Sequence, residues 1–125
     1  MNEKREQKRD LHARTFDFAR RVVKLCSILD ATPGVSRTLA HQLLRSGTSV
    51  GANVEEGQAS QSRADFISKY AIACKEARET HYWLRLLADA EIVPKSKLDP
   101  LTDEANQLVA ILTSIIKKTK ANKNS

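Results

Sequence analysis

RSGTSVGANVEEG, residues Arg45–Gly57, is rich in small and polar residues although it continues a long helical pattern. At ~100° per residue, its polar side chains share one narrow stripe of a helix. That stripe comprises Gln42, Arg45, Ser46, Ser49, Asn53 and Glu56. An apolar stripe roughly 80° away comprises Leu39, Leu43, Val50 and Val54. The segment therefore predicts a helix that buries one side and carries polar groups on the other.

Three glycines, Gly47, Gly51 and Gly57, lie in or at the end of this predicted helix. A glycine in a helix interior costs ~1 kcal/mol relative to alanine, so three close together need a structural reason. Close approach of another backbone, which a Cβ would block, is such a reason. We therefore interpret Gly47 and Gly51 as part of an oligomer interface.

Tyr82 and Trp83 are neighbours on a later helical segment, so they cannot both face the same core. Trp and Tyr are enriched at protein interfaces, and an exposed aromatic ring can also stack on an unpaired base. The glycines and an excess of apolar residues on the last helical segment favour a role in a protein interface over a role in base stacking. Tyr82 and Trp83 are therefore predicted to join the oligomer interface.

Apolar residues recur at three- and four-residue steps in four segments, and no segment reads convincingly as a strand. The first predicted helix runs from near Thr15 to Asp30, and the composition of the charged leader allows it to start earlier. Its buried face is predicted to comprise Phe16, Ala19, Val22, Val23, Cys26 and Leu29. After the break ATPG at residues 31–34, Ser36 is the predicted N-cap of the second helix, which ends near Gln58 or Ala59.

The third predicted helix has Ser62 as its N-cap, with Asp65 three residues later, and it ends near Ala90. Its predicted inner face comprises Phe66, Tyr70, Ala73, Ala77, Leu84, Leu87 and Ala88. The fourth helix is predicted to begin near Asp99, with Pro100 in the first turn, where a missing N–H does no harm. Its apolar seam comprises Leu101, Ala105, Leu108, Leu112 and Ile115.

Four helices with short connections pack most simply as an all-α, antiparallel, up-down-up-down four-helix bundle. A chain of 125 residues fits one domain. We divide it into a charged leader at residues 1–13, the bundle at residues 14–118 and a basic tail at residues 119–125.

Neither a signal peptide nor a membrane span is predicted, because the charged N-terminus precedes no apolar run of the needed length. We expect a cytoplasmic protein with no membrane partner. Cys26 and Cys74 are then expected to be free, buried thiols, since disulfides are rare in that compartment.

The formal net charge of +6 is concentrated at the C-terminus, where Lys117, Lys118, Lys120 and Lys123 have no acidic neighbour. Such a run attracts phosphate backbones, but solvated tails of the same composition are also common. Composition alone leaves nucleic-acid contact and a solubilising role both open.

Catalytic, metal and cofactor sites are not indicated. A di-metal bundle site needs Glu-x-x-His pairs, and no histidine here has a glutamate three residues before it. The spacing of Cys26 and Cys74 does not suit zinc. Ser46 and Ser49 lack the context of a nucleophile elbow, and no glycine-rich phosphate loop is present. The sequence therefore predicts a protein that is not an enzyme and that binds no cofactor.

The pattern RSxxSxxANxxEG at residues 45–57 resembles the bacterial four-helix-bundle family encoded within intervening sequences of 23S rRNA genes. EARETHYWLRLL, residues 76–87, resembles the third helix of that family. The family pattern maps onto Arg45, Ser46, Ser49, Asn53, Glu56, Gly57 and Glu79. The chain departs from the commoner form at Gly47, Val50 and Val54, which leaves the packing of the second helix open.

The resemblance implies a homopentameric ring of bundles. It also implies a fold shared with the accessory proteins of diversity-generating retroelements, which partner a reverse transcriptase and bind nucleic acid. Our leading hypothesis is a non-enzymatic, oligomeric protein that contacts RNA or DNA through Arg45, Ser49, Asn53 and the C-terminal lysines. The alternative is a protein–protein adaptor or accessory subunit with an incidental basic tail.

The polar stripe has a second interpretation, in which its members bond to one another inside the bundle or at a subunit contact. The predicted network comprises Arg45, Ser46, Asn53, Glu56 and Glu79, with Glu76 as a further partner. Buried polar groups need partners, and such networks often fix helix packing instead of binding ligands.

Overall fold

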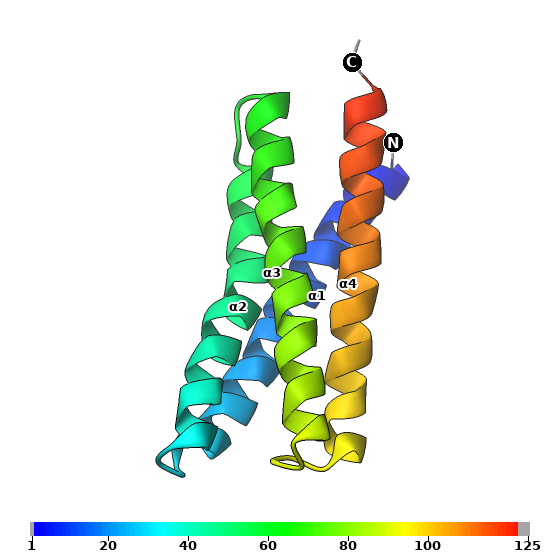
Figure 1. Cartoon of the computed structure of the whole chain (residues 1–125). Coiled ribbons are helices and arrows are strands. Elements are labelled where there is room, and N and C mark those ends of the chain that lie inside the picture. The colour runs from blue at the N-terminus through cyan, green and yellow to red at the C-terminus, as the bar shows by residue number, and fades with distance from the viewer. Residues whose placement is uncertain (1, 123–125) are drawn as a thin grey trace.

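Four helices make up nearly the whole chain in the computed structural model, which describes residues 2–122, with side chains from residue 11 onward. They are α1 (Asn2–Asp30), α2 (Val35–Gln58), α3 (Arg63–Asp89) and α4 (Lys95–Ala121). Successive helices run in opposite directions (Figure 1). No strand occurs among the residues that the structure describes. The predicted all-α, antiparallel four-helix bundle is confirmed.

The helices pack in chain order, with α2 along α1, α3 along α2, and α4 along α3. α1 lies obliquely and meets α4 over a shorter stretch (Figure 1). Arg14 fixes this meeting, because its guanidinium donates to both oxygens of Glu104 at 3.0 and 2.7 Å. A bidentate pair of this kind defines orientation as well as distance.

The buried face of α1 differs from the predicted one. Its buried side chains are Leu11, Thr15, Phe18, Val22, Cys26 and Leu29. The prediction was wrong for Phe16 and Val23, which are 67% and 43% exposed. Each of these two residues follows a buried one directly, so it points ~100° away from the core. Their apolar character therefore needs another explanation than the core of the bundle.

Gly47 and Gly51 of α2 face α1 of the same chain. A Cβ on Gly47 would stand 2.7 Å from Val22 Cγ1, and one on Gly51 would stand 3.3 Å from the Thr15 carbonyl oxygen. Gly47 is buried at this crossing, so it is not available to another subunit. The close approach predicted from the glycines exists between α1 and α2 of one chain. The assignment of Gly47 to an oligomer interface is therefore corrected, whereas that of Gly51, which lines a surface groove, stays a prediction.

The start of α2 also differs from the prediction. α2 begins at Val35, and its N-cap is Gly34, which has a φ of +98°. Glycine adopts this left-handed region without the steric cost that a Cβ imposes. Ser36 therefore lies within the first turn and is not the cap. The predicted cap of α3 is confirmed, because Ser62 Oγ accepts a hydrogen bond from the Asp65 N–H at 3.1 Å.

α4 begins at Lys95, one turn before the predicted start near Asp99. Pro100 therefore lies inside the helix, where it cannot donate to the carbonyl four residues earlier. Burial of an apolar side chain and one ion pair hold the first turn of α4 despite the missing hydrogen bond. Leu98 is buried, and Lys95 pairs with Asp99 at 3.0 Å across one turn.

Both cysteines are free and buried, as predicted. The Cys26 thiol donates to the Ala40 carbonyl oxygen at 3.3 Å. Burial, with a smaller effect of the nearby Asp30 carboxylate, raises the pKa of Cys26 to about 11. A thiol that stays protonated at neutral pH is a poor nucleophile, so this one serves packing. Within residues 2–122, no helix is both long and apolar enough to cross a membrane.

Candidate functional site

The polar stripe of α2 is bound to α3 through Arg45. The Arg45 guanidinium donates to both oxygens of Glu76 at 3.3 Å and pairs with the Glu79 carboxylate. The Trp83 indole N–H donates to Glu79 at 3.0 Å. This indole hydrogen bond, and then Arg45, hold the pKa of Glu79 below its ordinary value against the opposite effect of burial.

This cluster is poorly suited to binding phosphate. It contains one guanidinium, from Arg45, and two carboxylates, from Glu76 and Glu79, so its local charge is negative. The Arg45 side chain is half exposed, and ion pairs of that kind contribute only about 0.2–1 kcal/mol each. The arrangement therefore joins α2 to α3 and fixes the rotamer of Trp83.

The other members of the predicted network, and Ser49 of the predicted nucleic-acid contacts, are separate from this cluster. Ser46 is buried and accepts a hydrogen bond from the Thr80 hydroxyl at 2.9 Å. Ser49 and Asn53 donate to carbonyl oxygens of their own helix at 2.7 and 2.8 Å. Glu56 is exposed, with no hydrogen bond or ion pair to the described side chains. The predicted pairing of Arg45 with Glu79 and Glu76 is thus confirmed. The prediction was wrong for Asn53 and Glu56, which take no part in that cluster.

A basic end of the bundle is formed by two helices that are distant in sequence. Lys117, Lys118 and Lys120 are exposed on the last turns of α4. The Cys74 Sγ and Thr113 Oγ1 atoms lie 3.5 Å apart, which sets the register of α3 against α4. Lys69 lies five residues before Cys74 and Lys118 five residues after Thr113, so these two lysines lie at the same height.

Arg63, the first residue of α3, lies at this same end, which the α2–α3 turn shares with the C-terminal end of α4 (Figure 1). We define the basic end as Arg63, Lys69, Lys117, Lys118 and Lys120. Lys123, which belongs to the predicted nucleic-acid contacts, lies outside the described residues.

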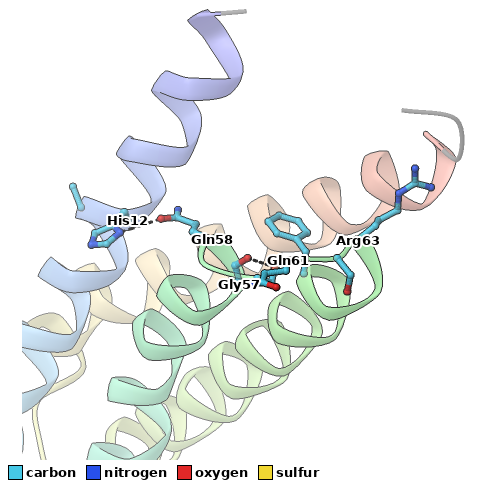
Figure 2. A pocket seen from close by; sticks show the side chains of 9 residues that line it. His12, Gly57, Gln58, Gln61 and Arg63 are labelled. Carbon is cyan, nitrogen blue, oxygen red and sulfur yellow. Dashed lines mark hydrogen bonds between the residues drawn. The ribbon is translucent and has the colours of Figure 1, made fainter.

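An open cavity of about 530 Å³ lies beside the basic end (Figure 2). Its wall consists of His12, Ala13, Gly57, Gln58, Ser60, Gln61, Ser62, Arg63 and Phe66. His12 spans from α1 to the end of α2, with Nδ1 3.2 Å from Gln58 Oε1 and Nε2 2.9 Å from Glu55 Oε1. Sequence reasoning missed this cavity, although the polar turn SQS at residues 60–62 marks one of its walls.

Tyr82 and Trp83 differ in exposure, as expected for two neighbours on a helix. Tyr82 is 48% exposed, whereas Trp83 is half-buried against the core. Their rings meet edge to face with centroids 5.0 Å apart, and the Arg85 guanidinium lies 5.9 Å from the Tyr82 ring centre. The partly exposed aromatic ring that the sequence predicts therefore belongs to Tyr82 more than to Trp83.

An exposed apolar surface runs along α1 and α2 on the outside of the bundle. Phe16 and Ala19 share a groove of about 220 Å³ with Gly51 and Ala52. Val23 continues this line on α1, and Leu44 continues it on α2. We name Phe16, Ala19, Val23, Leu44 and Ala52 the α1–α2 strip. Large exposed apolar patches commonly mark interaction sites.

No catalytic constellation is found among residues 11–122. No group of three or more His, Cys, Asp or Glu side chains there converges on a point that could hold a metal ion. The Ser46 and Ser49 hydroxyls bond to Thr80 and to main-chain oxygens, not to an imidazole. Burial, and then the charge of Arg85, lower the pKa of His81, which therefore stays neutral at physiological pH.

Comparison with known proteins agrees with this architecture. The family model described as 23S rRNA-intervening sequence protein matches residues 7–114. A solved protein of unknown function from the S23 ribosomal protein family of Bacteroides thetaiotaomicron is 39% identical and superposes with a TM-score of 0.82. The match covers 89% of this chain and 98% of the other. No curated protein matches the sequence. The chain therefore belongs to the 23S rRNA-intervening sequence protein family.

Proposed function

We propose that this protein is a non-enzymatic, oligomeric protein that binds the backbone of RNA or DNA through its basic end. The observation that carries the proposal is the concentration of cations at one end of the bundle, where α3 begins with Arg63 and α4 ends with exposed lysines. No acidic residue follows Glu104 on α4, so the lysines of its last turns are not neutralised within their own helix. Nucleic-acid phosphates bind such surfaces and release counterions as they do so.

Stabilisation of the α4 C-terminus is the simpler role for these lysines. Cations near a helix C-terminus interact favourably with the macrodipole, and Lys118 and Lys120 lie in the last turn. That role does not explain why Arg63 and Lys69 of α3 lie at the same end of the bundle. Cations that two helices bring to one end of the bundle fit a polyanion better than they fit a helix cap.

The polar stripe of α2 contributes less to this function than its composition suggests. Two carboxylates neutralise Arg45, and the Ser49 and Asn53 side chains donate to carbonyl oxygens of their own helix. We therefore propose that the basic end makes the primary contacts with nucleic acid. Arg45, Ser49 and Asn53 would make only secondary contacts.

Self-association is part of the proposal, and the α1–α2 strip supports it. Phe16 is 67% exposed in the single chain and lies in a groove whose walls are largely apolar. The family resemblance favours a homopentamer. Copies of the basic end on one ring would bind one nucleic acid together, so that weak contacts add up to useful avidity.

The direct test is to purify the protein and record its ultraviolet absorbance ratio, then to measure its mass by light scattering after nuclease treatment. The expected result is an assembly several times heavier than the 14.0 kDa chain, purified together with nucleic acid. A monomer without bound nucleic acid would contradict both parts of the proposal.

A protein–protein adaptor, such as an accessory subunit of a polymerase, is the second candidate function. The α1–α2 strip favours it, because an apolar face can receive a different protein as well as a second copy. Truncation after Ile116 separates the two functions. Loss of nucleic-acid binding on truncation supports the basic end, whereas a partner that binds the truncated chain equally well supports the adaptor.

A further inference from the structure

We infer that the N-terminal extension of α1, residues 2–10, pairs side by side with the same extension of a second copy of this chain. The inference rests on the self-association in the proposed function and names a contact that selects the copies. The backbone of these residues continues α1. His12 Nδ1 lies 3.2 Å from Oε1 of Gln58, the last residue of α2. The extension therefore continues past the end of α2 by about 14 Å (Figure 2).

The charged positions of the extension divide between two sides of the helix. At about 100° per residue, the basic positions fall within an arc of about 140° and the acidic positions within an arc of about 60°. The basic side comprises Lys4, Arg5, Lys8 and Arg9, and the acidic side comprises Glu3, Glu6 and Asp10. The centres of the two arcs are about 160° apart, so the two sides are nearly opposite.

This division does not stabilise the helix itself. Opposite charges four positions apart stabilise a helix, and like charges at that spacing destabilise it. The charged pairs at that spacing within residues 2–10 are Lys4–Lys8, Arg5–Arg9 and Glu6–Asp10, all of like charge. Basic residues in the first turns also oppose the helix macrodipole. The segregation of charge therefore fits contacts outside this helix better than it fits stabilisation within it.

The basic side continues the line of the α1–α2 strip. Arg9, Phe16 and Val23 follow one another at seven-residue steps, and each step turns the helix by only about 20°. Phe16 and Val23 are 67% and 43% exposed, on the side of α1 that faces away from the core. A second copy that covers the strip therefore also meets the basic side of the extension.

A second copy suits the extension better than nucleic acid does, because it uses both sides. Two nearly opposite, complementary sides form a head-to-tail contact, in which each copy offers its basic side to one neighbour and its acidic side to the other. A phosphate backbone would use the basic side alone and would be repelled by the carboxylates of the same helical turns. Complementary charge across an interface selects the partner and fixes the register more than it adds affinity.

The test is an exchange variant that mixes the charges of the two sides without changing the composition. It carries Glu3→Lys, Lys4→Glu, Arg9→Asp and Asp10→Arg. These changes convert the like-charge pairs four positions apart into opposite-charge pairs, so the helix itself should be stabilised. Association should nevertheless weaken, and about tenfold more protein should be needed for half-assembly, because several individually weak ion pairs are lost together. Mass by light scattering over a range of protein concentrations measures this, and circular dichroism confirms the helix.

A reversed variant is the matched rescue, because it restores two opposite sides with their signs interchanged. It carries Lys4→Glu, Arg5→Glu, Lys8→Glu and Arg9→Glu together with Glu3→Lys, Glu6→Lys and Asp10→Lys. Its association should recover to that of the unmodified protein. The difference between the exchange variant and the unmodified protein should vanish near 1 M salt, where the Debye length is about 3 Å.

The affinity for a single-stranded RNA oligonucleotide separates the inference from the proposed function. The exchange variant should bind RNA through an unaltered basic end, so its affinity per assembled protein should match that of the unmodified protein. Normal assembly of the exchange variant at low salt, or no recovery in the reversed variant, would overturn the inference while the proposed function stands. Normal assembly with weaker RNA binding would overturn it in favour of nucleic acid on the extension. A monomeric unmodified protein would overturn the inference and the proposed self-association together.

Discussion

Gly47 of α2 and Val22 of α1 mark the point where these two helices come closest. A Cβ on Gly47 would stand 2.7 Å from Val22 Cγ1 and 2.9 Å from Val22 Cγ2. Val22 is fully buried, and its branched side chain has little rotamer freedom in a helix. The glycine is therefore required by packing within one chain.

Gly47→Ala should destabilise the protein by up to about 2 kcal/mol. The strain of overpacking costs about 1–3 kcal/mol, and the gain in helix propensity offsets ~1 kcal/mol of it. Gly51→Ala is the matched control, because its Cβ would meet the Thr15 carbonyl oxygen at 3.3 Å and needs only a small shift. Urea unfolding followed by circular dichroism measures both. Equal stability of the two variants would contradict this account of the crossing.

Glu79 should make stability depend on pH in the acid range. Its folded pKa is lowered below the ordinary value of 4.5, so its contribution is present above that pH and is lost as the pH falls through the folded pKa. Glu79→Gln removes this titration. The stability of the unmodified protein should therefore fall more steeply below about pH 4.5 than that of the variant. Parallel curves from unfolding at several pH values would show that the Trp83 and Arg45 contacts contribute nothing.

Ser62→Ala should destabilise the protein by about 1 kcal/mol, because it removes the hydroxyl that caps α3. Ser36→Ala is the control at the other predicted cap. Gly34 occupies that N-cap position, so the change should be neutral within about 0.5 kcal/mol. Thermal unfolding of both variants checks the assignment. A larger loss for Ser36→Ala than for Ser62→Ala would contradict the observed helix starts.

Phe16→Glu should weaken self-association if the α1–α2 strip joins the subunits. Phe16 is 67% exposed, so a charged residue there is tolerated by the single chain but not by an apolar interface. The measured mass should fall toward the 14.0 kDa of one chain. Ile72→Glu makes a similar change on α3, at a residue that is 37% exposed, and should leave the mass unchanged. An unaltered mass for Phe16→Glu would exclude the strip as the interface.

The four helices were predictable because apolar spacing and the breaks between helices depend on local sequence. Helix ends were less predictable, since burial of Leu98 extends α4 backward past Pro100 and a positive φ moves the cap of α2 to Gly34. Phe16 and Val23 were misassigned because their apolar character alone does not show which side of α1 faces the core.

The candidate site was predictable only in part. The C-terminal lysines stand out in composition, whereas their position at the same end of the bundle as Lys69 depends on the register of α3 against α4. The cavity brings together His12, Gln58 and Phe66 from three helices, and no local pattern encodes that meeting. The sequence left open whether Arg45 contacts nucleic acid or pairs with Glu76 and Glu79, and the packing of α2 against α3 brings about the pairing.

The salt dependence of nucleic-acid binding tests the central claim most directly. The affinity for a single-stranded RNA is measured from low to moderate salt, for the unmodified protein and for the triple variant Lys117→Gln, Lys118→Gln and Lys120→Gln. The account predicts that affinity falls steeply with salt, and that the variant binds more weakly with a slope reduced by about 2 for each bound basic end, since each phosphate contact contributes ~0.7. An affinity that stays flat with salt, or a slope that the three substitutions leave unchanged, would contradict it.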